Sequence, residues 1–251
     1  MQKRISSALA GLVLACAAAT PAMADEHPAI KRAFSVPPSA DLAYSIKARQ
    51  KGFTLSGEAQ LIWRAGDGKY SLNSESRAAI VGKLLENRSN GAIDAFGVAP
   101  ATFYEKRYRK EPYTVTFDRS AKEIRFTDDP ATYPINGGEQ DRGSATWQLA
   151  SVARAAPEKF VAGSEWPFFV AGRTNAAPWV FKVVARETIK TGMGELEAVH
   201  LARTPPPGSR DQKLDIWLAP SQEWYPVRIR LSDDDDVIEQ TLEKITKKAG
   251  S

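Results

Sequence analysis

The sequence predicts a mainly β protein: a single curved antiparallel sheet, forming an unclosed or half barrel, with one main α-helix packed against it. Three observations support this prediction. Many short segments alternate apolar and polar residues, as half-buried strands do. Turn residues such as those at Gly66 and Gly68 separate these segments, which leaves no room for the helical crossovers of parallel strands. One alanine-rich segment has helical spacing instead.

The first 24 residues have the plan of a secretory signal peptide. Lys3 and Arg4 give a positive start, an apolar stretch follows, and the small-residue triplet "AMA" ends at Ala24. The apolar stretch is shorter than the roughly 20 residues that span a bilayer. We therefore expect export with cleavage after Ala24. The alternative is a lipoprotein acylated at Cys16, because "VLAC" loosely resembles a lipobox.

The exported part of the chain is predicted to consist of an amino-terminal arm and a single domain. Residues 25–40 are polar and contain three prolines, which predicts a flexible, loosely packed arm, and residues 41–247 read as a single β-rich domain. Loss of Lys3 and Arg4 would lower the formal net charge from +4 to +2, since both are basic. So near-neutral a chain is a poor nucleic-acid binder. No later segment is long and apolar enough to be a transmembrane segment.

The first two predicted strands come directly after the amino-terminal arm. Alternate residues from Leu42 to Ala48 form one apolar face, and alternate residues from Phe53 to Trp63 form another. The turn "AGDGK" closes this strand onto the next, in the manner of a hairpin. Short strand-like pieces such as "YTVTFD" and "KEIRFT" then continue the antiparallel meander.

One helix is predicted in the exported chain, from Asp141 to Ala155. The segment "DRGSATWQLASVARA" is rich in alanine, and Asp141 or Ser144 can cap its amino end by accepting free backbone N–H groups. Pro157 limits its carboxyl end. We expect this helix to serve as a lid or a wall, with Trp147 as its first residue to test.

Strands return after the helix, and the most distinctive of them is the hairpin "KLDIWLAPSQEWYPVRIRL". Leu214, Ile216 and Leu218 share one strand face, which predicts that they feed an apolar layer. Trp217 falls on the opposite face and Trp224 lies in the connection. The hairpin is therefore predicted to have a structural role. Its two indoles, Trp217 and Trp224, are candidate contacts for a ligand or partner.

The sequence offers few groups for chemistry. His27 and His200 are the only histidines, and His200 lies on a strand, where a surface or hydrogen-bonded role is usual. The chain has no GxSxG elbow, phosphate-binding glycine loop, HExxH motif or paired cysteines. Asp233 to Asp236 read as a solvated turn rather than a calcium loop. No catalytic residue, metal or cofactor is predicted, and an enzyme is not expected.

The bulky aromatic residues are a stronger indication of a binding site than these polar groups. They form either a dense core or the lining of an apolar cavity inside the curved sheet, and the core interpretation is favoured. The candidate ligand-binding residues are Trp147, Phe103, Trp63, Trp217 and Trp224.

Two segments, "PINGGEQDRGSATWQLASVA" and "DIWLAPSQEWYPVRIRL", give the chain a family resemblance. Together with the first strands, they resemble the bacterial domain-of-unknown-function family 3108 from about Leu42 to Ile245. The most specific positions, read as a structural motif, are Gln140, Asp141, Arg142, Ser144, Gln148, Leu149 and Ala150, with the hairpin residues 217–220 and 225–230. The resemblance implies an exported, periplasmic envelope protein and brings no catalytic residues. More distantly, the chain is similar to the LolA/LolB-type lipoprotein carriers, which implies an unclosed barrel with a helical lid over an apolar cavity.

Three functions remain in order of preference. The first is a non-catalytic periplasmic binding or carrier protein for a lipid or another apolar envelope molecule. The alternative is a module that docks on another envelope protein. The third is an enzyme acting on the cell wall or a polysaccharide, for which no acidic pair stands out.

Overall fold

The computed structural model describes residues 27–50, 52–78, 81–209, 211–233 and 236–248. The predicted signal peptide, its cleavage site and Cys16 lie outside these residues. Among the described residues, no helix combines the length and the apolar character needed to cross a membrane.

Fifteen strands, one α-helix and two short 3-10 helices make up the described chain. The elements before the helix are β1 (Ala40–Gln50), β2 (Phe53–Gly66), β3 (Lys69–Ala78), β4 (Gly82–Asp94), β5 (Gly97–Arg107), β6 (Tyr113–Asp118), β7 (Glu123–Phe126), β8 (Thr132–Pro134) and β9 (Gln140–Asp141). The helix α1 (Ser144–Ala155) and η1 (Pro157–Lys159) follow. The remaining elements are β10 (Glu165–Ala171), β11 (Ala176–Thr191), β12 (Gly194–Arg203), β13 (Lys213–Ala219), η2 (Pro220–Gln222), β14 (Tyr225–Asp233) and β15 (Asp236–Lys247).

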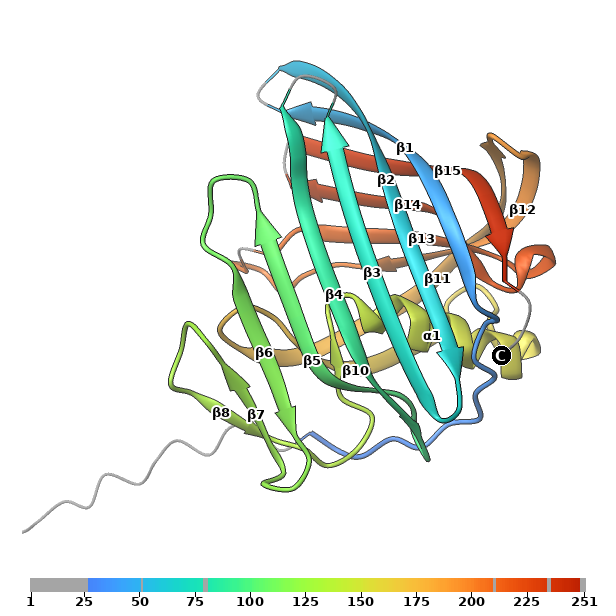
Figure 1. Ribbon diagram of the computed structural model, residues 1–251. Helices are drawn as coiled ribbons and strands as arrows, with labels where there is room; N and C mark the ends of the chain where they lie inside the picture. The colour runs from blue at the N-terminus through green and yellow to red at the C-terminus, as the bar shows by residue number, and fades with distance from the viewer. Residues whose placement is uncertain (1–26, 51, 79–80, 210, 234–235, 249–251) are drawn as a thin grey trace, which may run out of the picture.

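All fifteen strands belong to one sheet, in the order β8-β7-β6-β5-β4-β3-β2-β1-β15-β14-β13-β12-β11-β10-β9. Pairing of β1 with β15 joins the first and last parts of the chain, and every pair is antiparallel except β9 with β10. The sheet stays open between its two short edge strands, β8 and β9. β1–β5 cross in front of β11 and β13–β15 (Figure 1). The predicted fold class, a curved unclosed antiparallel sheet with one helix, is confirmed.

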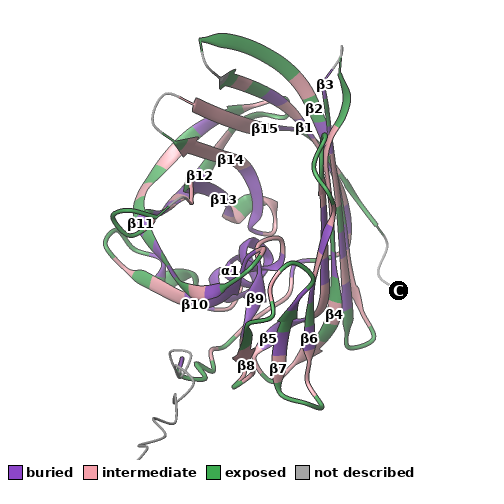
Figure 2. Cartoon of the chain, turned by 90° about the vertical axis from the view of Figure 1, so that its left-hand side faces the viewer, coloured by how far each residue is buried: buried purple, intermediate pink, exposed green. Residues whose placement is uncertain are grey.

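The helix lies inside the curve of the sheet (Figure 2). Its first ten residues, Ser144 to Ala153, are all buried, so the helix is covered on every side. Trp147 packs toward β1–β3 in one core cluster, and Leu149 and Val152 pack toward β10–β13 in a second. The small alanine and serine side chains between them let both walls of the sheet approach the helix. α1 is thus a central filler rather than an outer lid.

Neither Asp141 nor Ser144, the two predicted caps, occupies the N-cap position of this helix, which is Gly143 and has no side-chain cap. The Asp141 carboxylate instead lies two residues before that position. Its Oδ1 accepts the backbone N–H groups of Gly143 and Ser144 at 2.7 and 2.8 Å, and its Oδ2 accepts the Ser89 hydroxyl at 2.5 Å. The helix begins three residues later than predicted because Gln140–Asp141 form β9 beside β10.

Three further motif residues also serve the architecture. The Gln148 side chain accepts the Val98 N–H at 2.8 Å and donates to the Phe96 carbonyl at 2.6 Å, so it holds the β4–β5 turn. Ser144 Oγ accepts the Asp141 N–H at 2.9 Å. Arg142 pairs with Asp211 at 2.8 Å.

Two features differ from the sequence prediction. The arm before β1 is not loosely packed: Ser35 N–H donates to the Ser151 carbonyl of α1 at 2.8 Å, and the Trp63 indole donates to the Pro37 carbonyl at 2.9 Å. Phe53 and Leu55, at the start of the predicted apolar face of β2, are 73% and 44% exposed. The β1–β2 hairpin extends beyond the core there, so alternation continues where nothing packs against it.

Candidate functional site

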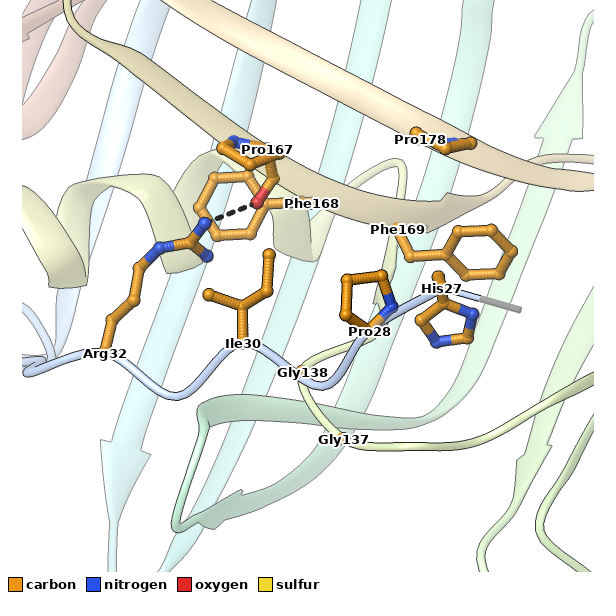
Figure 3. Close-up of a pocket in the computed structure, with 10 residues that line it drawn as sticks. All are labelled: His27, Pro28, Ile30, Arg32, Gly137, Gly138, Pro167, Phe168, Phe169 and Pro178. Carbon is orange, nitrogen blue, oxygen red and sulfur yellow. Dashed lines mark hydrogen bonds between the residues drawn. The ribbon is translucent and has the colours of Figure 1, made fainter. Parts of the chain in front are cut away.

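An apolar pocket lies between the amino-terminal arm and strands β10 and β11 (Figure 3). Its volume is about 260 Å³. The lining residues are His27, Pro28, Ile30, Arg32, Gly137, Gly138, Pro167, Phe168, Phe169 and Pro178. Prolines, phenylalanines and one isoleucine form most of the wall, and the ionisable members are His27 and Arg32. An apolar cavity of about 150 Å³ binds benzene, so this pocket has room for a larger apolar group.

One end of the pocket is built on a buried histidine–glutamate pair. The His27 Nε2 lies 2.8 Å from Glu139 Oε1, and its ring stacks on Phe169 at 3.7 Å between centroids. The same carboxylate oxygen accepts the N–H groups of Asn136 and Gly137. Burial alone would raise the pKa of Glu139, but the hydrogen bonds from His27 and Gly137 outweigh it and leave that pKa below its usual value. This pair fixes the start of the arm against the domain.

The other end of the pocket holds an arginine. Arg32 Nη2 donates to the Pro167 carbonyl at 2.8 Å, and the guanidinium lies 4.9 Å from the Phe168 ring centroid (Figure 3). Burial lowers the pKa of Arg32 from its ordinary value. The arm therefore crosses β10 with a polar contact at each end and with Pro28 and Ile30 between them.

Replacement of His27 by alanine should release the arm. A hydrogen bond to a charged group is worth about 1.5–3 kcal/mol, so the population of the open arm should rise by at least about tenfold. Trypsin cleavage after Lys31 and Arg32 should accelerate accordingly, because proteolysis follows the open population. Mass spectrometry of timed digests measures this rate. Pro28→Ala, which leaves the hydrogen bond between His27 and Glu139 in place, is the control. Equal cleavage of H27A and wild type would show that this hydrogen bond does not hold the arm.

Three of the aromatic residues predicted to bind a ligand lie in the core. Trp63 and Trp147 stack on each other at 4.1 Å with an interplanar angle of 10°, and Tyr225 packs against Trp147 edge-on. Phe103 has no exposed surface and packs edge-on against Tyr113. The structure brings Trp63 and Trp147 together, but none of the three lines the apolar pocket.

The two indoles of the β13–β14 hairpin are buried as well. Trp217 stacks on His200 at 4.2 Å and donates its Nε1–H to Glu187 at 3.1 Å. Trp224 packs edge-on against Phe160. Neither lines the apolar pocket, and the two belong to different core clusters.

His200 lies on strand β12, and it is hydrogen-bonded as predicted. Its Nδ1 lies 2.9 Å from Glu187 and its Nε2 lies 2.8 Å from Asp215. Burial would raise the pKa of Asp215, but the hydrogen bond from His200 and the charge of Lys213 lower it overall. Both ring nitrogens are therefore engaged, and the cluster ties β11, β12 and β13 together. In the part of the chain that the structure describes, no three histidine, cysteine or acidic side chains gather as metal ligands would.

A second, polar cleft of about 410 Å³ lies between the β1–β2 hairpin and β13–β15. Its charged lining includes Lys47, Lys213, Asp215, Arg230 and Glu239. Arg230 pairs with Glu239 at 2.6 Å and Lys213 with Asp215 at 3.4 Å, so much of its charge is internally neutralised.

Sequence reasoning misses the apolar pocket because it predicts a loosely packed arm. A signal is present in the segment from Ile30 to Val36. Its even positions hold Ile, Arg, Phe and Val, and Lys31, Ala33 and Ser35 lie between them. Such alternation is typical of an extended segment with one face against a protein surface. The strand that this segment covers cannot be identified from the sequence.

A family model described as a protein of unknown function (DUF3108) matches residues 43–243. Among curated proteins, none matches the sequence. Similar solved structures include a β-barrel-like protein of domain of unknown function DUF1849 from Brucella abortus. It is 11% identical, with 86% of this chain and 100% of that chain covered, and the TM-score is 0.57. This likeness concerns the fold alone.

Two further solved structures are less similar. A protein with a YmcC-like fold from Bacteroides fragilis is 11% identical, with 87% and 100% of the two chains covered and a TM-score of 0.37. A domain described as an outer membrane lipoprotein-sorting protein from Vibrio parahaemolyticus is 8% identical, with 85% and 87% covered and a TM-score of 0.29. At these TM-scores neither likeness carries an argument.

Proposed function

The chain belongs to the DUF3108 family, and from that premise we propose that it is a periplasmic, non-catalytic protein that binds or carries a lipid or another apolar molecule of the cell envelope. Export with cleavage after Ala24 is part of this proposal. The observation that carries it is the apolar pocket beneath the amino-terminal arm.

The pocket supports binding because it leaves apolar surface uncovered beside a packed domain. This uncovered surface belongs to Ile30, which is 37% exposed, and to the exposed Pro28 and Pro178. Phe168 and Phe169, which are only 5% and 7% exposed, form the packed wall behind it. Covering such surface gains roughly 25 cal/mol per Å² removed from water. The lining is rich in proline and aromatic residues, which lose little conformational freedom on binding.

The core aromatics take a supporting role in this proposal. Trp63, Trp147 and Phe103 hold the two walls of the sheet together, and Trp217 and Trp224 stabilise the β13–β14 hairpin. The ligand contacts fall instead to Ile30, Phe168 and Phe169.

A charged group in the pocket should abolish binding. Ile30→Asp places a carboxylate against apolar walls, and desolvation of that charge should weaken binding of a twelve-carbon alcohol by at least about tenfold. Isothermal titration calorimetry measures the affinity. Val161→Asp is the matched control, because Val161 is 57% exposed and lies outside the pocket. Equal binding by wild type and I30D would contradict the assignment of this pocket.

A further inference from the structure

Arg32 is a cation at the edge of an apolar pocket whose described lining contains no acidic residue. The guanidinium donates to the Pro167 carbonyl and lies over the Phe168 and Trp166 rings, 4.9 and 6.0 Å from their centroids. Across the described residues, no carboxylate forms an ion pair with it. The neighbouring Lys31 is exposed to solvent.

A half-buried guanidinium without an anion is energetically costly. Desolvation disfavours the charged form, and carbonyl and aromatic contacts compensate only in part. Burial correspondingly lowers the pKa of Arg32. Other arginines whose side chains are partly buried pair with an acid, as Arg154 does with Glu223 and Arg142 with Asp211. Arg32 therefore offers a binding site for an anion at the edge of the apolar pocket.

We propose that the ligand of this pocket is a single-chain anionic amphiphile, whose carboxylate or phosphate head pairs with Arg32 while its chain lies along Ile30, Phe168 and Phe169. This inference rests on the proposed function and specifies its ligand class. Arginine suits such a head because its planar fork of N–H donors matches two oxygens of a carboxylate or phosphate. The apolar chain then runs along the arm toward His27, as the lining residues lie in Figure 3.

The test compares ligands of one chain length and different heads. The full chain, produced by export and freed of bound lipid, is titrated with dodecanoate, dodecyl phosphate and dodecanol below their micelle concentrations. Wild type should bind one or both anions at least about tenfold more tightly than the alcohol. Arg32→Gln should remove this preference, measured as the ratio of each anion's affinity to the affinity of the same variant for dodecanol. Lys31→Gln, which makes the same charge change one residue away, should retain the preference.

The outcomes separate the two proposals. If wild type binds no amphiphile, the proposed function and this inference both fail. If all three ligands bind equally and R32Q changes nothing, the pocket binds apolar chains but the anionic head is wrong. If inorganic phosphate or acetate binds as tightly as the amphiphiles, Arg32 is a simple anion site and the inference is overturned. Unchanged thermal unfolding of R32Q shows that a lost preference does not come from misfolding.

Discussion

Replacement of Trp147 by alanine should destabilise the protein by about 3–5 kcal/mol, as expected for a fully buried tryptophan. Trp147 is 1% exposed, stacks on Trp63 at 4.1 Å and contacts Tyr225 edge-on, so it joins α1 to β2 and β14 at once. The cavity left behind cannot close easily, because the sheet walls on both sides are held by their own strand pairing. Chemical denaturation followed by circular dichroism measures the change.

Two variants calibrate this result. Trp147→Phe keeps an aromatic ring at the stacking position and should lose less than the alanine variant. Tyr108→Ala removes an aromatic side chain that is 45% exposed and should stay within about 0.5 kcal/mol of wild type. A W147A protein as stable as the Y108A control would show that α1 is not the filler between the two walls.

The second large effect concerns pH and Asp141. Burial raises the pKa of the Asp141 carboxyl to about 6, although hydrogen bonds from Ser89, Ser144 and Gly143 act to lower it. The unfolded value is near 3.9, so the folded protein holds this proton more tightly. The stability gained from protonation is fully present below about pH 4 and is lost as the pH rises through about 6, and it is on the order of 3 kcal/mol.

Asp141→Asn isolates this contribution. The amide oxygen can accept the Gly143 and Ser144 N–H groups, and it does not titrate. The stability of wild type relative to D141N should therefore fall between about pH 4 and pH 7, measured by denaturant unfolding at each pH. A difference that is constant across this range would contradict the buried carboxyl. Asp141→Ala should destabilise at every pH by about 2–4 kcal/mol, because it leaves the buried Ser89, Gly143 and Ser144 donors without their acceptor.

Local patterns are sufficient to predict the strands, the helix and the hairpin. Alternation from Leu42 to Ala48 and the glycines at positions 66 and 68 translate directly into β1 and the β2–β3 hairpin. The positive φ angles of Asp67 and Gly68, 49° and 69°, match the tight turn that the sequence indicates. These features depend on neighbours in sequence, so periodicity reveals them.

The candidate site could not be predicted because it depends on contacts between distant segments. His27 meets Glu139 across 112 residues, and Arg32 meets Pro167 across 135. Alternation places Trp217 on the opposite face from Ile216, but both faces of β13 are covered, since His200 stacks on that indole and Glu187 accepts its N–H. Strand alternation distinguishes two faces and gives no information on what covers each of them.

The central claim is that the pocket beneath the arm holds an apolar ligand, and native mass spectrometry of protein purified from the cell envelope tests it most directly. Wild type and V161D should carry a bound amphiphile that I30D lacks, with all three proteins folded to the same degree by circular dichroism. A stable protein partner recovered with an empty pocket would favour docking on another envelope protein instead. Wild type that carries no small molecule, or that retains the same one in I30D, would contradict the claim.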